Sequence, residues 1–419
     1  MEASKDSVLM LAVRAGEIML KSGAEVYRAE ETVERICRSC GFPYAQCFIT
    51  TTGIFASLGD NVQGTEVHTV LKRIKGLSTD LEKVSRINTF VRTFVAQSSH
   101  GAEEIDASRE ELEQIDATTK GFNMPIRLLA MVAIAVFFTM MNGGSLIDGA
   151  LSIGVAIITY LFSLVVEWLR INRFIVVFAS CFVAAALSLL VFNLGPCSSL
   201  SAMIMGSVII FLPGVAIANA ARDLLSGDML AGVARATESV LVAIAIAGGT
   251  GLLLRFGPLP LHTDIHLQYA LPLGILFAFI GTMGVAVMVN IPRRHLLIAG
   301  LIAACGWLID QLIILSGSSS ILACFLATCT VALLAEIATR VTKEAATLFI
   351  IPAIFPLVPG KVMYSAVLEM LNGNPDGAIF WGTQALLMAG GIAVALLVMI
   401  SLTRITASLY RRIRRIEIF

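Results

Sequence analysis

A succession of long apolar runs fills the chain from Pro125 onward, and this feature constrains the fold more than any other. A helix needs roughly 17 to 25 apolar residues to cross a bilayer. Ten runs are close to this length, at about 126–141, 145–166, 174–192, 199–221, 231–254, 268–289, 295–315, 319–338, 345–369 and 378–402. We therefore predict a polytopic α-helical membrane protein with ten transmembrane helices and the lipid bilayer as a partner.

Composition supports this class of protein. Hydrophobic residues make up 57% of the chain and charged residues 14%, whereas soluble proteins carry roughly 25% charged residues. The formal net charge is zero, which gives no reason to expect a nucleic acid partner.

The first 120 residues differ from the rest because charged residues are frequent in them. Aromatic and β-branched residues over 44–58 and 65–74 flank a Gly-Asp-Asn turn and predict a hairpin. Helical spacing predicts helices at 7–40, where Ser22-Gly23 separates two of them, and at 81–98 and 102–118. We predict an N-terminal α+β domain at 1–120, and it should be cytoplasmic because charges interrupt any signal-peptide core.

Cysteine spacing gives no metal site. Cys37 and Cys40 form a C-x-x-C pattern without a second matching pair, and a structural zinc ion needs about four ligands. We expect reduced cytosolic thiols, no metal and no cofactor.

Basic residues set the orientation. If the N-terminus lies inside, the cytoplasmic loops hold nearly all of the Lys and Arg residues of the membrane region, and the outer loops hold only Arg255. Positive residues favour the cytoplasmic side. We predict a multi-pass protein of the cell inner membrane with both termini in the cytoplasm.

A sequence pattern occurs twice, 146 residues apart. Pro213-Gly214 maps onto Pro359-Gly360, Asp223 onto Glu369, Leu225 onto Leu371, Gly227 onto Gly373, Thr237 onto Thr383 and Glu238 onto Gln384. Each copy then holds five spans, and an odd number of spans inverts the second copy, as in many secondary transporters. We predict a five-plus-five inverted repeat, with membrane halves at 121–257 and 258–419 joined through the linker 255–268.

Each Pro-Gly pair interrupts an apolar span. Proline removes a backbone donor and clashes with the preceding turn, so the helix bends or unwinds there. The freed carbonyls and half-helix ends can face a substrate or ion. We therefore place Pro213, Gly214, Pro359 and Gly360 in a candidate substrate- and ion-binding site where the two breaks meet; a packing kink is the alternative.

Charged residues within spans usually face a cavity or a partner. Lys361 stands where the first copy has Val215, and it can hold a substrate carboxylate or pair with Asp310 or Glu336. Asp310, in the middle of its span, is the better candidate for a proton relay. Both join the candidate site.

Five further polar residues complete the candidate site. Glu238 suits a proton-coupled carboxylate opposite Gln384, and an interfacial pair of Glu238 with Arg235 is the equal alternative. Asn219 and Asp223 follow the first break and Glu369 follows the second, where gate and cap roles are both open.

The chain resembles the threonine/serine exporter family. The resemblance rests on AGEIMLKSGAEVYRAEETVERICRSCGF, FITTTGIFASL, LSTDLEKVSRINTFV and the two halves bearing FLPG and PLVPG, and it covers nearly the whole length. It implies export of small polar metabolites driven by an ion gradient, threonine and serine in one type and a dicarboxylate such as succinate in a type split into two chains. Gly23, Glu25, Arg28 and Glu31 match the N-terminal pattern of the family, in which an i, i+3 ion pair is one interpretation.

We therefore expect a secondary exporter of threonine- or serine-type amino acids, by alternating access and proton-coupled antiport, and not an enzyme. A dicarboxylate exporter, a channel and a membrane-anchored hydrolase built from Ser22, Ser57, Thr50 to Thr52, Asp60, Glu66 and His68 are the alternatives. No G-x-S-x-G motif supports the hydrolase. A homo-oligomer stays open.

Overall fold

The structure, a computed structural model, describes residues 4–59, 67–97, 100–118, 121–195, 197–254 and 269–416. The predicted linker 255–268 and the candidate residues Asp60 and Glu66 lie outside these ranges. The chain forms two compact units. We call Met1–Gly121, Asn219–Arg235 and Val289–Pro292 the N-terminal unit, and Phe122–Ala218, Ala236–Met288 and Arg293–Phe419 the membrane unit.

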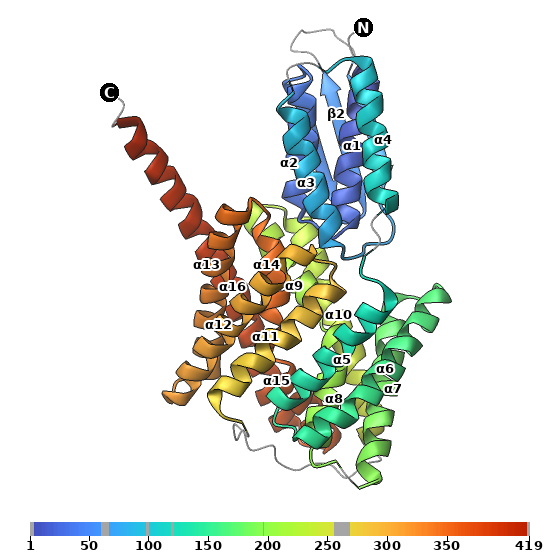
Figure 1. Cartoon of the computed structure of the whole chain (residues 1–419), viewed down its shortest axis with the longest axis vertical. Helices are drawn as coiled ribbons and strands as arrows, with labels where there is room; N and C mark the ends of the chain where they lie inside the picture. Colours follow the sequence, from blue (N-terminus) through green and yellow to red (C-terminus); the bar gives the residue numbers. More distant parts are fainter. Residues whose placement is uncertain are drawn as a thin grey trace. The chain divides into compact units, whose positions relative to one another are not determined.

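Four helices and a three-stranded sheet build the first 121 residues (Figure 1). The helices are α1 (Lys5–Lys21), α2 (Val26–Ser39), α3 (Leu81–Val95) and α4 (Ala102–Thr118). The predicted break between the first two helices is confirmed: Gly23 has a φ of +90°, which glycine adopts without the steric cost that a side chain adds. The predicted α+β character is likewise confirmed.

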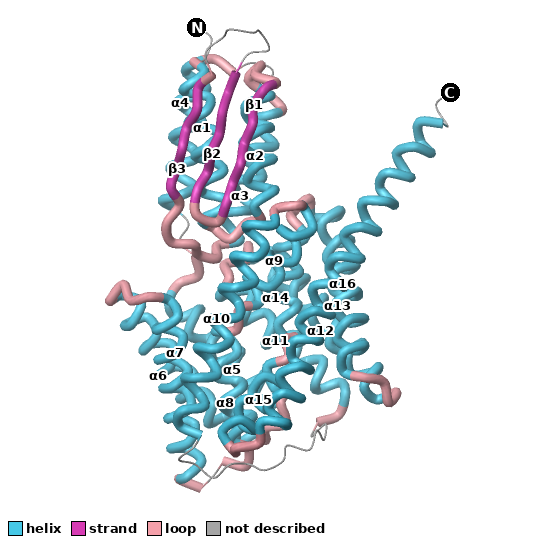
Figure 2. Tube along the Cα trace, turned by 180° about the vertical axis from the view of Figure 1, so that it is seen from behind, coloured by secondary structure: helices cyan, strands magenta, loops and turns pink. Residues whose placement is uncertain are grey.

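The sheet is antiparallel, with order β1 (Tyr44–Thr50), β2 (Gly53–Gly59) and β3 (His68–Arg73). Helices cover one of its faces (Figure 2), where Ile49, Ile54 and Leu58 are buried. The run 44–58 was predicted as one arm of a hairpin, but it contains a hairpin of its own. Thr50 pairs with Gly53, and the Thr50 hydroxyl accepts a hydrogen bond from the amide of Thr52, a local side-chain turn that competes with a continuous strand.

Two buried ion pairs tie the α1–α2 turn to the segment 219–235 inside the N-terminal unit. An Arg222 Nη1 atom lies 2.9 Å from Glu25 Oε1, and Arg235 Nε lies 3.3 Å from Asp223 Oδ2. Asp223 also accepts a hydrogen bond from the amide of Val26. Burial by itself would raise the pKa of Glu25, but the charges of Arg222 and Arg28 hold that pKa below 4.5. Glu25 is therefore the anionic partner of Arg222, which is almost two hundred residues away in the sequence.

Two further donors complete this contact, which we call the clasp (Glu25, Asn219, Arg222, Asp223 and Arg235). Asn219 donates to the carbonyl of Gly23, and Arg235 donates to the carbonyl of Ala24, both at 2.8 Å. The backbone of the α1–α2 turn is thus bonded through its carbonyls and through the first amide of α2.

The membrane-type helices are long and apolar. They are α5 (Met124–Met141), α6 (Leu146–Trp168), α7 (Arg173–Asn193), α8 (Leu200–Val208), η1 (Ile209–Phe211), α9 (Gly214–Ser226), α10 (Met229–Leu254), α11 (Leu271–Met288), η2 (Arg293–His295), α12 (Leu296–Leu315), α13 (Ser320–Thr342), α14 (Ala346–Ile354), η3 (Phe355–Leu357), α15 (Gly360–Leu371) and α16 (Pro375–Ile416). Within the described ranges, eight are long and apolar enough to cross a membrane, or up to ten segments if each bent pair is one span. Several apolar helices of membrane-spanning length are thus present, in agreement with the predicted multi-pass membrane protein.

Both predicted helix breaks are present. The axis bends by 52° between Leu200–Phe211 and Gly214–Leu224, and by 43° between Ala346–Leu357 and Gly360–Met370. The hydrogen bonds at the two breaks match, because the amide of Gly214 donates to Leu212 and the amide of Gly360 donates to Val358. Proline without an amide hydrogen accounts for both interruptions.

Element starts repeat with a constant offset. α8, η1, α9 and α10 begin at residues 200, 209, 214 and 229, and α14, η3, α15 and α16 begin at 346, 355, 360 and 375, each 146 residues later. The left-handed glycines that follow α9 and α15, Gly227 and Gly373, keep the same offset. The spacing read from the sequence therefore extends to the secondary structure.

The clasp generates a stability prediction. Glu25→Ala should destabilise the protein by about 3 to 5 kcal/mol, because it leaves the buried guanidinium of Arg222 without a countercharge. Glu34, on α2, which begins directly after Glu25, forms a 2.8 Å pair with the exposed side chain of Arg38, so Glu34→Ala should cost less than about 1 kcal/mol. Thermal unfolding of the purified variants measures both; equal losses would contradict the burial argument.

Glu30 generates a pH prediction. Burial, together with the negative charges of Asp228, Glu34 and Asp223, raises its pKa from 4.5 to about 7. The folded state then binds the proton more tightly than the unfolded state, so this group makes stability fall as the pH rises from about 4.5 to 7. Glu30→Gln should flatten that part of the pH profile and raise stability at pH 8 by about 1 to 2 kcal/mol, allowing for partial exposure. Unfolding midpoints between pH 5 and pH 8 test it.

Candidate functional site

A cavity of about 550 Å³ lies within the membrane unit. Small-molecule sites usually measure roughly 300 to 1,000 Å³ and have mostly apolar walls with a few polar groups. Residues of α5, α8, η1, α10, α11, α12 and the break between η3 and α15 line it. Its polar lining includes Asn142, Ser199, Thr250, Tyr269, Asp310, Gln311, Ser320, Lys361 and Tyr364.

The two helix breaks contact each other at this cavity. A side-chain carbon added at Gly214 would lie 2.8 Å from the ring of Phe355, and one added at Gly360 would lie 3.6 Å from Leu212. Phe355, Leu212, Pro359 and Gly360 line the cavity. α8 of the first broken pair also lies beside α15 of the second (Figures 1 and 2). The glycines thus allow the close approach of two interrupted helices.

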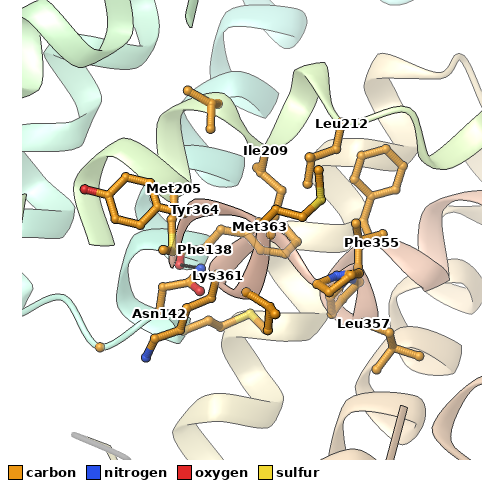
Figure 3. A pocket seen from close by; sticks show the side chains of 18 of the residues that line it. Phe138, Asn142, Met205, Ile209, Leu212, Phe355, Leu357, Lys361, Met363 and Tyr364 are labelled. Carbon is orange, nitrogen blue, oxygen red and sulfur yellow. Dashed lines mark hydrogen bonds between the residues drawn. The ribbon is translucent and has the colours of Figure 1, made fainter. Parts of the chain in front are cut away.

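Lys361 is the cationic side chain of the cavity lining. Figure 3 shows it on α15 with Tyr364, one helical turn further on, and with Asn142 from the end of α5. Within the described part of the chain, its ammonium has no hydrogen-bond or ion-pair partner, so neither Asp310 nor Glu336 pairs with it. Glu336 instead lies 4.0 Å from Arg340 on its own helix.

Asp310 supplies the carboxylate of the same cavity. It lies on α12 among the lining residues, and its Oδ2 atom accepts a hydrogen bond of 3.1 Å from Gln311. Asp310 and Lys361 therefore bring opposite charges to one cavity without neutralising each other. Four of the predicted site residues meet here: Asp310, Pro359, Gly360 and Lys361.

Other predicted site residues lie elsewhere in the membrane unit. Glu238 on α10 pairs with Arg173 at 2.9 Å, so the partner of its ion pair is not the predicted Arg235. Glu369 is half-buried and accepts a 2.9 Å hydrogen bond from Asn374 at the end of α15. Gln384 is half-buried on α16 and is not among the cavity-lining residues. Pro213 and Gly214 are buried beside the cavity-lining Leu212.

Asn219 and Asp223 belong to the clasp of the N-terminal unit, as described above. The family-pattern residue Glu25 pairs with Arg222 in that clasp, and Arg28 donates to Asn88. The i, i+3 interpretation of Glu25 and Arg28 missed the partner because Arg222 is distant in sequence.

Sequence reasoning also missed polar cavity residues. The hydroxyl of Tyr364 is buried and has no hydrogen-bond partner among the described residues. The Tyr269 hydroxyl donates to the carbonyl of Gly144 at 3.1 Å. Tyr364 follows Lys361 by three residues, a spacing that places both on one helix face. That spacing is the signal by which it could have been found.

The residues of the hydrolase alternative do not converge where they are described. Ser57 shares a 3.0 Å hydrogen bond with Thr69, whereas His68 pairs with Asp6. Side chains alternate across a strand, and His68 lies opposite the buried Leu58 rather than beside Ser57. His68 and Ser57 therefore face opposite sides of the sheet.

Broken apolar spans that contact each other beside a cavity with polar groups occur in many membrane transporters. Residues 10–257 match a family described as "Putative threonine/serine exporter", and residues 274–402 match one described as "Threonine/Serine exporter, ThrE". The chain belongs to the threonine/serine exporter family.

Two relatives are named for the same activity. A "Probable threonine/serine exporter" of Mycobacterium tuberculosis (strain ATCC 25618 / H37Rv) is 24% identical over 406 residues, which are 93% of this chain and 74% of the relative. A "Threonine/serine exporter" of Corynebacterium glutamicum is 23% identical over 258 residues, which are 58% of this chain and 50% of the relative. No solved structure matches the chain.

The contact between the breaks predicts unequal effects at equivalent positions. Gly214→Ala should destabilise by about 1 to 3 kcal/mol, because the new methyl group overlaps the buried ring of Phe355. Gly360→Ala meets only an ordinary contact with Leu212 and should be almost neutral. Unfolding midpoints of the two variants measure the difference. Phe355→Leu, added to Gly214→Ala, should recover part of the loss; no recovery would place the strain elsewhere.

Proposed function

We propose that this protein is a secondary exporter of threonine- and serine-type amino acids, which bind in the cavity where the two broken helices meet. The observation that carries this proposal is the presence of Lys361 and Asp310 in one cavity without an ion pair between them. The names of the relatives support the substrate class.

The charges favour a zwitterion. An amino acid carries one carboxylate and one ammonium group. Lys361 can pair with the carboxylate, and Asp310 can pair with the ammonium group. The tyrosine and amide groups of Tyr364, Asn142 and Gln311 can bond a side-chain hydroxyl. A dicarboxylate such as succinate needs two cationic or strongly donating partners, and among the described lining residues Lys361 is the one that carries a positive charge. The dicarboxylate exporter is therefore the second candidate.

We infer alternating access from the paired breaks. The constant offset of 146 residues and the matching hydrogen bonds at Leu212 and Val358 support an internal repeat. Five spans in each half would invert the second copy, and inverted repeats let one central site open to either side in turn. We propose membrane halves at 121–257 and 258–419, with both termini and the domain 1–120 in the cytoplasm and with location in the cell inner membrane.

We assign the coupling ion to the proton and its carrier to Asp310. This carboxylate is among the cavity-lining residues, and within the described ranges its one hydrogen bond comes from the neutral amide of Gln311. Glu238, in contrast, forms an ion pair with Arg173. Proton–substrate antiport through one carboxylate links the two fluxes, since the proton and the substrate ammonium compete for Asp310. Sodium would be the alternative ion, and a homo-oligomer is open.

The site proposal is tested by matched substitutions. Lys361→Gln and Asp310→Asn should each reduce threonine export at least about tenfold, as expected when a buried charged contact worth roughly 1.5 to 3 kcal/mol is lost. Arg340→Gln and Glu336→Gln remove a cation and a carboxylate from an exposed pair and should export normally. Efflux of labelled threonine at equal membrane abundance gives the readout. Wild-type efflux from both cavity variants would move the site away from the cavity.

Substrate and coupling are tested on vesicles. Labelled threonine and serine should leave the vesicles faster than labelled succinate does. A protonophore should stop their efflux. Preferred efflux of succinate would establish the second candidate. Flux that ignores every imposed gradient would indicate a channel instead.

A further inference from the structure

The clasp lies within the N-terminal unit, and three of its residues belong to α9, a helix that begins in the membrane unit. α9 runs without interruption from Gly214, at the first break, to Ser226. Its residues Asn219, Arg222 and Asp223 bond to Gly23, Glu25 and Val26 of the α1–α2 turn. Because α9 is a single helix, a rotation at the Pro213-Gly214 break must also move the clasp residues.

The clasp has no counterpart in the second half. At an offset of 146 residues, Asn219, Arg222 and Arg235 correspond to Ser365, Leu368 and Trp381, so both arginines are absent. Glu369, at the position of Asp223, bonds instead to the neighbouring Asn374. The first broken helix, α9, therefore takes part in a tertiary contact, whereas the second, α15, ends in a local cap. The two broken helices are thus held differently.

Energetics permit the clasp to open. Removing one partner of a buried ion pair is costly, but separating both partners into water restores the hydration of each, and the net difference is small. Among the residues that the structure describes, several clasp atoms have no hydrogen-bond partner in the protein, namely Glu25 Oε2, Asn219 Oδ1 and Arg222 Nε and Nη2. These buried groups would gain partners on hydration, which lowers the cost of opening further.

We propose that the clasp is a gate: the α1–α2 turn holds α9 in one state of the transport cycle and releases it in the other. This inference rests on the alternating-access mechanism proposed above. It gives the N-terminal region a direct mechanical part in transport, and it makes Glu25 and Arg222 positioning residues for the movement of the first broken helix.

Hydrogen exchange on the wild-type protein tests the gate. The Val26 amide donates to the carboxylate of Asp223, so its protection reports a closed clasp. Saturating threonine should make this amide exchange about tenfold faster, because cycling populates the open clasp. The amide of Ile105 on α4, which donates to Gly101, should not change. Exchange at Val26 that is unaffected by threonine, in protein that transports threonine, would overturn the proposal.

A reversible cross-link provides the functional test. Val26→Cys and Asp223→Cys, introduced together and joined by a short thiol cross-linker, should reduce threonine efflux by about tenfold or more, and reductant should restore it. The same double variant without the cross-linker is the control, since it carries both substitutions but leaves the two segments unlinked. If threonine efflux is undiminished when the cross-link is complete, the clasp does not open during transport and the proposal is wrong.

Different results would contradict the proposed export function and the proposed gate. If wild-type vesicles move neither threonine nor serine, the proposed function is wrong and the gate falls with it. If they transport threonine but Val26 exchange and cross-linked efflux are both unaffected, only the gate is wrong. Should the double variant fail to fold, the exchange measurement on the wild type decides alone.

Discussion

Backbone amide and carbonyl groups in a hydrocarbon environment must find hydrogen-bond partners within the protein. The rest of this structure depends on how this constraint is met at Pro213 and Pro359. A straight helix satisfies the constraint by itself. Pro213 and Pro359 interrupt two spans, and each interruption is tolerable only where protein or water can reach the freed groups. The breaks lie against each other and next to a cavity, so the interruptions of the two helices and the cavity occur in the same part of the membrane unit.

Symmetry in this chain is a property of the backbone rather than of the side chains. The starts of the elements and the hydrogen bonds at the breaks repeat, whereas the charges do not. Lys361 and Asp310 come from the second half, and Arg222, Asp223 and Arg235 come from the first. The two halves therefore share a backbone pattern but differ in where their charged side chains lie.

Local features were predictable from sequence, and long-range pairings were not. Apolar length located the spans, and Pro-Gly pairs located both bends. The hairpin within 44–58 was missed because Thr50, Thr52 and Gly53 form a turn without the usual Asn-Gly or Asp-Gly signal. Asn219 and Asp223 were assigned to the site by their closeness to the break in sequence. Their partners Gly23 and Val26 lie almost two hundred residues away, and no spacing rule reaches that far.

The distribution of the two polar clusters along the chain has a consequence for how such a protein can be divided. All clasp residues precede residue 236, while the cavity takes Asn142 and Leu212 from one side of the linker 255–268 and Asp310 and Lys361 from the other. A chain cut at that linker would keep its clasp within one polypeptide, but it would have to assemble two polypeptides to complete the cavity. Under the function proposed above, ligand binding would then require both polypeptides together.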